Sequence, residues 1–233
     1  MSVSLVIPTW NEAAGIAATL GAVPSLVDEI VVVDADSADG TAEIARAHGA
    51  RVLTERRRGY GRALKTGFDA ARGDILGSAD GDGTYPLAAL PALVERMIGS
   101  GAQFISCSRF PLVDPRAMEP RNRIGNRLLS VASSLLFGHS FADVLSGMWL
   151  MRREAWTRLA LVSDGWNFSE EIKVRAMESL GDRFAELHID YRGRLGQTKL
   201  QPWRVGLQNL AWLGLMRLGL ERQAKTTLER VRA

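Results

Sequence analysis

The stretch that decides the fold is Asp-Ile-Leu-Gly-Ser-Ala-Asp-Gly-Asp-Gly-Thr-Tyr-Pro, at residues 74–86. Residues 75–79 are apolar or small and predict a buried strand, and Asp80 and Asp82 follow at once, each before a glycine. In open α/β sheets ligands bind beyond the carboxyl ends of the strands, where carboxylates can share a divalent cation with a diphosphate. The same pattern is also typical of a solvated turn that caps itself, so this stretch alone leaves both interpretations open.

The composition is that of an ordinary globular protein, with 46% hydrophobic and 24% charged residues among 233, which predicts a packed core. Cys107 is the one cysteine of the sequence and is expected to be a small buried residue in a reducing compartment. The first residues lack the features of a signal peptide, and no clean apolar span of about 20 residues is present. We therefore expect a cytoplasmic protein.

The charge is unevenly distributed along the chain. Residues 188–233 contain nine Lys and Arg against three Asp and Glu, net +6, whereas the whole chain has a formal charge of +3. A basic tail that also contains Trp203 and Trp212 suits an anionic membrane surface or a phosphorylated substrate, although a solvated face is the simpler alternative. Nucleic acid would also suit such a tail, but we expect no nucleic-acid partner, given the resemblance described below.

Strands alternate with helices along the chain, which predicts a mostly parallel, doubly wound α/β sheet. The expected strands are 4–9, 29–33, 51–54, 75–79, 103–108, 147–151 and 185–191. The expected helices are 13–20, 42–48, a helix through 68–71, 86–98, 123–137, 169–180 and 202–220. Three prolines predict an irregular excursion between 110 and 121. The last helix is expected to dock on the core, lie at a membrane interface or pair with another subunit.

Carboxylates follow several of the expected strands. They are Glu12, Asp34, Asp36, Asp80 and Asp82. Because parallel strands end at the same edge of a sheet, we expect one acidic rim, which would repel itself without a cation or hydrogen-bond donors. The alternative is that loop acids cap helices, which accounts for Asp39 and also suits Asp36.

Several motifs, in their order and spacing, resemble those of a family 2 glycosyltransferase with the GT-A fold. They are Val6-Ile-Pro-Thr-Trp-Asn-Glu, Val33-Asp-Ala-Asp-Ser-Ala-Asp-Gly-Thr, Gly59-Tyr-Gly-Arg-Ala-Leu-Lys-Thr-Gly-Phe and Ala79-Asp-Gly-Asp-Gly-Thr-Tyr-Pro. The second half resembles the dolichyl- or polyprenyl-phosphate sugar transferases. It does so through Ser108-Arg-Phe, Asn122-Arg-Ile-Gly-Asn, Ser146-Gly-Met, Phe168-Ser-Glu-Glu-Ile-Lys-Val-Arg-Ala and Arg194-Leu-Gly-Gln-Thr-Lys-Leu.

The resemblance implies a nucleotide-sugar site and a metal site. The nucleotide-sugar residues would be Pro8, Thr9, Asn11, Glu12, Asp34, Asp36, Asp80 and Gly81. Asp80 and Asp82 would hold Mg²⁺ or Mn²⁺, which offsets the charge that develops on the departing nucleoside diphosphate. The family usually has Asp-Gly where this chain has Ala35-Asp36, and this difference leaves the nucleobase open.

The resemblance also implies acceptor-side residues. Arg109, Arg123, Arg194 and Lys199 match motifs that would bind an acceptor phosphate, whose oxygen is already ionised and needs no general base. A hydroxyl acceptor would instead need a carboxylate to take its proton, and Glu170 and Glu171 are the candidates. Glu171 matches the family's glutamate, so the expected catalytic residues are Asp82, Glu171 and Arg194. The alternative is that both glutamates merely favour a helix N-terminus.

We therefore expect one glycosyltransferase domain over residues 1–233. It would comprise a nucleotide-sugar half (1–109), an acceptor half (110–200) and a basic amphipathic helical tail (201–233). The expected reaction is inverting and metal dependent, from a UDP- or GDP-sugar to a polyprenyl phosphate. The alternatives are transfer to the hydroxyl of a soluble small molecule and a catalytically silent nucleotide-binding partner. The tail suits peripheral attachment to a membrane, and the C-terminal helix suits a homo-oligomer.

Overall fold

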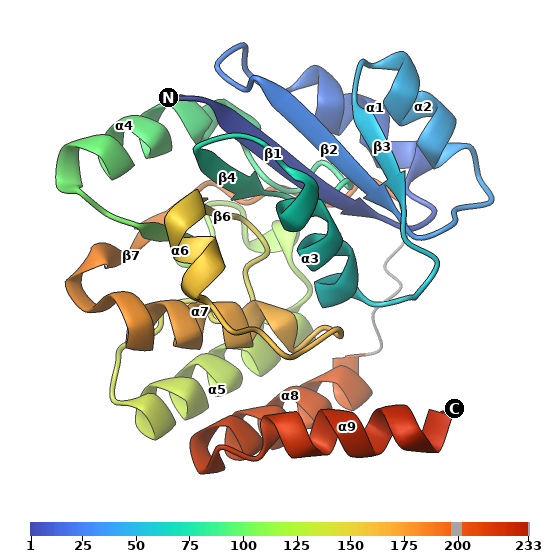
Figure 1. Cartoon of the computed structure of the whole chain (residues 1–233). Coiled ribbons are helices and arrows are strands. Elements are labelled where there is room, and N and C mark those ends of the chain that lie inside the picture. The colour runs from blue at the N-terminus through green and yellow to red at the C-terminus, as the bar shows by residue number, and fades with distance from the viewer. Residues whose placement is uncertain (197–201, 233) are drawn as a thin grey trace.

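The computed structural model describes residues 1–196 and 202–232, the last six of these as backbone only. Its strands form one sheet in the order β3-β2-β1-β4-β6-β5-β7 (Figure 1). β6 runs antiparallel to β4 and β5, and the other pairs are parallel. The strands are β1 (Val3–Thr9), β2 (Glu29–Asp34), β3 (Arg51–Thr54), β4 (Ile75–Ser78), β5 (Phe104–Ser108), β6 (Trp149–Arg152) and β7 (Phe184–His188). The prediction of a mostly parallel α/β sheet is confirmed.

Helices cover both faces of this sheet (Figure 1). One face packs against α1 (Ala13–Gly21), α2 (Thr41–Ala47) and α4 (Leu90–Ser100). The other packs against α3 (Tyr60–Ala70), α5 (Pro120–Phe137), α6 (Arg153–Arg158) and α7 (Phe168–Leu180). Along β1, Leu5 and Ile7 belong to the first core and Val6 to the second. A parallel strand that is buried on both faces is apolar throughout, which explains the continuous apolar run of this strand.

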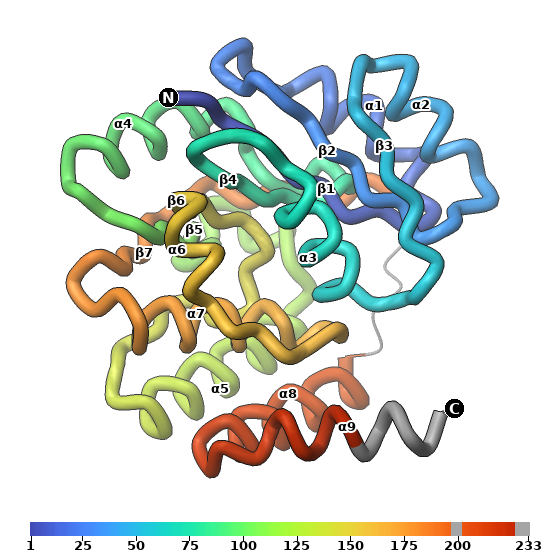
Figure 2. The backbone as a smooth tube through the Cα atoms, in the orientation of Figure 1, coloured from blue at the N-terminus to red at the C-terminus, as the bar shows by residue number. Residues whose placement is uncertain are grey.

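The last two helices lie outside α5 and α7, as the backbone trace in Figure 2 shows. α8 (Pro202–Leu218) packs on both helices, buries Trp212 and Leu213, and is followed by α9 (Glu221–Arg232). The chain reverses at Gly219, whose φ of 69° lies in the left-handed region. Such a conformation is typical of a glycine that ends a helix. We expected a helix over 202–220 within a basic amphipathic helical tail over 201–233, and the structure divides this tail into two helices.

Several boundaries differ from the sequence expectations. α5 begins at Pro120 and not at residue 123, because proline suits the first turn of a helix. α4 begins at Leu90, after a 3₁₀ turn at Leu87–Ala89, and the short helix α6 was not predicted. β6 and β7 both lie within residues 110–200, so the two expected halves share one sheet.

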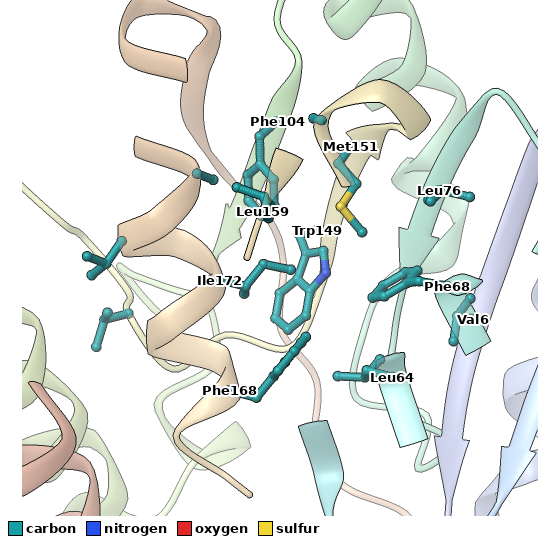
Figure 3. Packing of buried hydrophobic residues seen from close by; sticks show 14 of the residues in the cluster. Val6, Leu64, Phe68, Leu76, Phe104, Trp149, Met151, Leu159, Phe168 and Ile172 are labelled. Atoms are coloured by element: carbon teal, nitrogen blue, oxygen red, sulfur yellow. The ribbon is translucent and has the colours of Figure 1, made fainter. Parts of the chain in front are cut away.

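Trp149 of β6 is the largest fully buried side chain of the described residues. Figure 3 shows its ring between α7, which supplies Phe168 and Ile172, and α3, which supplies Phe68. The Trp149 and Phe168 ring centroids are 6.3 Å apart and the rings are tilted by 43°. Burial of rings this large dominates the stability of a core. The packing therefore fixes α7 against the sheet.

α7 also carries buried charged residues. Glu170 and Lys173 are completely buried, and the Lys173 ammonium donates to the backbone oxygen of Asp143 over 2.7 Å. Burial lowers the pKa of Lys173 to about 8. Neither carboxyl oxygen of Glu170 has a hydrogen-bond partner among the described residues, and burial raises its pKa well above the usual value. Burial without a hydrogen-bond partner therefore favours the protonated form of Glu170 in the folded protein.

Among the described residues, no helix combines the length and the apolar content that a bilayer crossing requires.

We expect Glu170→Gln to stabilise the fold increasingly as the pH rises. The raised folded pKa means that the stability contributed by this group is present below the unfolded pKa of about 4.3 and is lost as the pH rises toward the folded value. Glutamine has no proton to lose. The variant should match the wild type near pH 4 and exceed it by roughly 1–3 kcal/mol at pH 8, as measured by urea denaturation. A difference that does not change with pH would contradict a buried neutral carboxyl.

Candidate functional site

The acidic residues predicted to share one edge do so because of the strand order. Thr9, the last residue of β1, pairs in register with Asp34, the last residue of β2. β4 lies on the other side of β1 and leads directly into the loop that contains Asp80 and Asp82. Three parallel strands thus deliver their following loops to one edge of the sheet, where ligands of α/β proteins bind.

Asp80 and Asp82 make different contacts. Oδ1 of Asp82 accepts hydrogen bonds from the Thr84 backbone N–H at 3.1 Å and from the Thr84 hydroxyl at 2.7 Å, so the self-capping turn is present. Oδ1 of Asp80 accepts a hydrogen bond from the Tyr60 hydroxyl at 3.2 Å. Burial, followed by the charge of Asp82, raises the pKa of Asp80 to about 7. The loop therefore holds two close carboxylates, a costly arrangement when both are ionised.

Gly81 allows the loop to approach its neighbours closely. A Cβ atom at Gly81 would lie 2.9 Å from Cγ2 of Thr9. A Cβ atom at Gly15, in α1, would lie equally close to the Asp82 backbone. Larger residues at either position would push α1 and β1 away from the acidic loop.

Hydrogen bonds connect the two loops that are expected to bind the nucleoside. Both oxygens of the buried Asp34 accept hydrogen bonds, from the Thr9 hydroxyl at 3.0 Å and from the backbone N–H and hydroxyl of Ser37. Asn11, with a φ of 53°, accepts a bond from the Ala38 N–H at 3.0 Å. Asp34 thus shapes the loop, and any contact that it makes with the nucleotide stays a prediction. Asp36 is exposed at this rim, next to the half-buried residue Ala35.

Asp39 has the capping role that the sequence suggested. Its carboxylate accepts hydrogen bonds from the Thr41 backbone N–H and hydroxyl at the start of α2, and from the Ala13 N–H at the start of α1. It therefore holds two helix N-termini and is not part of the acidic cluster.

Arg194 neutralises the acidic rim. Its Nη2 lies 2.5 Å from Oε1 of Glu12, and its Nη1 lies 2.8 Å from Oδ2 of Asp82. Its segment is fixed by two backbone hydrogen bonds to the acidic loop, from Arg192 N–H to Thr84 O and from Leu195 N–H to Asp82 O, each 2.9 Å. The acceptor half of the chain thus supplies the positive charge that the rim needs. Lys199 lies outside the described residues.

A divalent cation fits this site. Carboxylate oxygens are the ligands that Mg²⁺ and Mn²⁺ prefer, and Mg²⁺ is usually bound through one or two carboxylates together with substrate phosphates. Asp80 and Asp82 supply such a pair. In the described part of the chain no group of three or more His, Cys, Asp or Glu residues is placed to hold a metal. A cation here would therefore depend on a bound diphosphate for further ligands.

Arg109 is placed differently from the sequence expectation. Its guanidinium is buried and forms a bidentate pair with Asp143, with Nε–Oδ2 at 2.7 Å and Nη2–Oδ1 at 2.8 Å. Asn126 donates to the same carboxylate. Because Asp143 already matches its charge, Arg109 is a poor candidate for binding an acceptor phosphate. Arg123 lies half-buried in the first turns of α5, and its predicted role stays a prediction.

Glu171 has a different role from the predicted general base. Its two oxygens accept hydrogen bonds from the backbone N–H groups of Val162 at 2.6 Å and Ser163 at 2.7 Å. Burial raises its pKa, and these two bonds lower it. A carboxylate that is buried and bonded on both oxygens is not placed to take a proton from an acceptor. These contacts favour a structural role for Glu171 over the predicted role of general base.

Tyr60 and Trp166 are site residues that the sequence analysis missed. Their rings stack with centroids 5.0 Å apart and planes 16° apart, and the Tyr60 hydroxyl contacts Asp80. The sequence feature that could have identified Tyr60 is the Gly59-Tyr60-Gly61 motif. A Cβ atom at Gly59 would lie 2.2 Å from the backbone oxygen of Asp164, so only glycine lets α3 begin against this loop.

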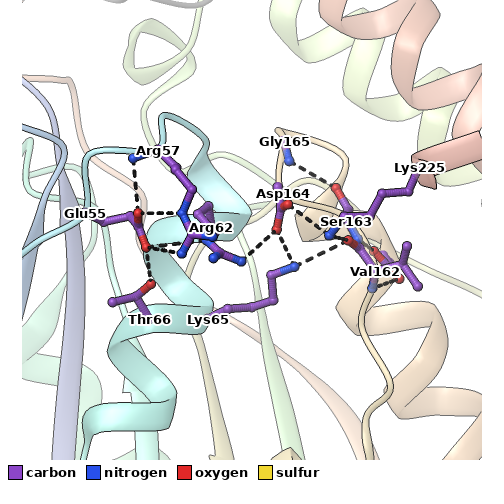
Figure 4. Close-up of polar contacts among 11 residues, drawn as sticks. Glu55, Arg57, Arg62, Lys65, Thr66, Val162, Ser163, Asp164, Gly165 and Lys225 are labelled. Atoms are coloured by element: carbon purple, nitrogen blue, oxygen red, sulfur yellow. Dashed lines mark hydrogen bonds and ion pairs between the residues drawn. The ribbon is translucent and has the colours of Figure 1, made fainter. Parts of the chain in front are cut away.

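Residues 162–165 are contacted by lysines from two different helices, as Figure 4 shows. Lys65 of α3 and Lys225 of α9 both form ion pairs with Asp164, the second at 2.9 Å. Both lysines also donate to the backbone oxygen of Val162. Together with Glu171 of α7, these contacts fix the loop that presents Trp166.

Several known proteins are similar to this chain. The sequence profile described as Glycosyl transferase family 2 matches residues 4–159. The dolichyl-phosphate hexose transferase of Haloferax volcanii is 34% identical over 212 residues, covering 87% of this chain and 88% of that protein. The undecaprenyl-phosphate mannosyltransferase of Micrococcus luteus is 30% identical over 225 residues, covering 88% of this chain and 90% of that protein.

Other similar proteins differ in length or in acceptor. The low-salt glycan biosynthesis hexosyltransferase Agl6 of Haloferax volcanii is 31% identical over 91% of this chain, and the match spans only 53% of that relative. Among solved structures, glucosyl-3-phosphoglycerate synthase from Mycobacterium tuberculosis, in complex with Mn²⁺, UDP and glucosyl-3-phosphoglycerate, superposes with a TM-score of 0.77. It is 27% identical, over 94% of this chain and 80% of that one.

We expect Glu171→Gln and Glu170→Gln to shift stability in opposite directions. In Glu171→Gln the new side-chain NH₂ group would face one of the two backbone N–H groups, so one of the two hydrogen bonds would be lost. This loss should cost about 1–3 kcal/mol. Thermal denaturation of both variants at pH 8 provides the measurement, with Glu170→Gln as the matched neighbour. If Glu171→Gln instead kept full stability and lost turnover alone, the general-base interpretation would return.

Proposed function

The chain belongs to Glycosyl transferase family 2, and on this premise we propose that it transfers a hexosyl group from a nucleoside diphosphate sugar to polyprenyl phosphate. The predicted glycosyltransferase activity and GT-A fold are both confirmed. The identity of the donor sugar and its base, UDP or GDP, is left open by the proposal.

The donor side of the proposal is supported by the acidic loop. We infer that the diphosphate lies across the edge where Asp80 and Asp82 meet the Glu12 loop, as the topology of α/β ligand sites favours. When bound there, Mg²⁺ or Mn²⁺ supplies Lewis-acid stabilisation of the leaving diphosphate. The structural neighbour contains Mn²⁺ together with UDP. Asp80, oriented by Tyr60, and Asp82, oriented by Thr84, are the residues that would hold the cation.

A phosphate acceptor suits the site better than a hydroxyl acceptor. Attack by an ionised phosphate oxygen needs no general base, only cationic groups that position it. Both oxygens of Glu171 are occupied, and Glu170 is fully buried, so neither glutamate is placed to activate a hydroxyl. Arg123 and Lys199 remain our proposed contacts for the acceptor phosphate, whereas Arg194, the third residue predicted for this role, lies at the donor edge beside Asp82.

The proposal of a lipid acceptor rests on the exposed side chains of two helices. We define the α5–α8 surface as the exposed side chains of α5 and α8, two helices that pack on each other. Each apolar member is at least half exposed: Ile124, Leu128, Val131, Leu135, Trp203, Leu207, Leu210 and Leu218. Along α5 their spacing places them on one side, opposite the buried residues Asn126 and Leu129. α8 likewise buries Trp212 and Leu213 on its other side.

The charge of the α5–α8 surface fits an anionic membrane. The two helices contain five arginines, at positions 121, 123, 127, 204 and 217, and no aspartate or glutamate. Helices that combine an exposed apolar face with cationic residues lie in the interface of anionic bilayers. This surface therefore supports a peripheral protein whose acceptor is a membrane lipid phosphate. Assembly through the C-terminal helix stays a prediction.

The second candidate is transfer to a small phosphorylated acceptor. It is favoured by the similarity to glucosyl-3-phosphoglycerate synthase, which is found with phosphoglyceric acid in another complex. That candidate gives no account of the exposed apolar face.

We expect UDP or GDP to bind with a divalent cation and Asp82→Asn to weaken that binding about 100-fold, the scale of a lost charge-assisted contact. Calorimetric titration with Mn²⁺ or Mg²⁺ present measures it. Asp182→Asn, an exposed aspartate in the 3₁₀ turn Gly181–Arg183, is the control and should bind normally. Equal binding by the Asp82 variant would contradict the donor site.

We expect the protein to bind anionic vesicles and to glycosylate polyprenyl phosphate within them, but not free 3-phosphoglycerate. Leu128→Glu combined with Leu207→Glu should reduce vesicle binding at least about 10-fold, because two carboxylates oppose burial in the interface. Ile98→Glu, at a half-exposed position of α4, is the matched control. Co-sedimentation and a transfer assay with each acceptor decide the question. Transfer to 3-phosphoglycerate alone would favour the second candidate.

A further inference from the structure

Arg194 occupies a position in which it competes with a cation. Oδ1 of Asp82 is engaged by both donors of Thr84, so Oδ2 is the oxygen directed away from the turn. That oxygen lies 2.8 Å from Nη1 of Arg194. A metal ion ligated by Oδ2 would bring its charge next to the guanidinium, which is strongly unfavourable in a site shielded from water. The two cations therefore exclude each other at Asp82.

The surrounding carboxylates make some positive charge necessary at this site before a cation binds. The Asp82 side chain is only 4% exposed and that of Glu12 is 12% exposed, and Arg194 contacts both. Partly buried carboxylates that lose their counter-charge are destabilised by desolvation and by mutual repulsion. Arg194 thus holds the acidic rim together when no cation is bound.

Exchange of Arg194 for a metal ion needs no movement of the backbone. Residues 192 and 195 are bonded through their N–H groups to the acidic loop. The Leu195 side chain also packs over Gly83, where a Cβ atom would lie 3.0 Å from it. Only the Arg194 side chain, which is 29% exposed, has to swing away. The oxygens of a diphosphate entering with the metal would offer the guanidinium a bidentate partner.

We propose that Arg194 is the resident counter-cation of the donor site, released from Asp82 when metal and nucleoside diphosphate bind together. This inference rests on the proposed function, since it assumes that the diphosphate binds at the acidic loop. Its consequence is that the metal alone binds weakly, because it must displace a paired arginine. The diphosphate removes that penalty, so metal and nucleotide strengthen each other's binding by the same factor. Arg194 acts here as a positioning residue.

The test compares Arg194→Gln with Arg192→Gln. Glutamine removes the charge and keeps some hydrogen bonding, and Arg192 is an exposed arginine of the same segment. Mn²⁺ binding to the protein without nucleotide is measured by electron paramagnetic resonance, then repeated with saturating UDP or GDP. Thermal denaturation checks that both variants fold.

We expect Arg194→Gln to bind Mn²⁺ about ten-fold more tightly than the wild type when nucleotide is absent, the scale of a partly buried charge pair. The enhancement of Mn²⁺ binding by nucleotide should shrink by a similar factor. Arg192→Gln should resemble the wild type in both respects. Adding Asp82→Asn to Arg194→Gln should abolish the gain.

Three results would overturn the inference in different ways. If wild-type Mn²⁺ binding depends on Asp82 but Arg194→Gln leaves it unchanged or weaker, Arg194 is merely a structural ion pair and the proposed donor site survives. If Mn²⁺ binds to no variant, with or without nucleotide, the metal site fails and the inference fails with it. If Arg192→Gln bound Mn²⁺ more tightly by the same factor, the effect would come from the net charge of the segment and not from the pairing of Arg194 with Asp82.

Discussion

The constraint on which this structure depends is the burial of a parallel sheet on both faces. Strands covered by helices on each side end at a common edge, so β1, β2 and β4 bring Glu12, Asp34 and Asp82 together although the chain separates them widely. Such a concentration of carboxylates in a partly desolvated edge requires compensation. The structure supplies it through hydrogen bonds at Asp34 and Asp82 and through the guanidinium of Arg194.

A second set of contacts connects the C-terminal helices to this edge. Lys225 of α9 holds Asp164, and the same loop presents Trp166 to Tyr60, which contacts Asp80. Glu171 fixes the loop from α7 through two backbone N–H groups. α9 packs on α8, one of the two helices proposed to lie against a membrane, so these contacts connect that helix to the loop that supports the proposed metal site.

Sugar transferases that act on lipid phosphates and a glucosyltransferase found with a small phosphorylated acid are both similar to this chain. Each of these similarities covers most of the chain, and the pair of carboxylates at Asp80 and Asp82 is compatible with any nucleoside diphosphate. We propose that the α5–α8 surface is the part that distinguishes a lipid acceptor from a soluble one. Leu128 and Leu207 are exposed there. Large exposed apolar patches are rare on proteins that act only in water and mark interaction sites.

The sequence alone determined the order of strands and helices, because apolar runs and glycines such as Gly49 mark them locally. It also placed Asp80 and Asp82 after a buried strand. It did not reveal the antiparallel direction of β6, the break between α8 and α9 or the bonds that occupy Glu171, because partners from distant segments leave no periodic signal. The pairing of Arg194 with Glu12, 182 residues away in the chain, was decided by tertiary structure, since only the folded sheet brings the two charges within reach.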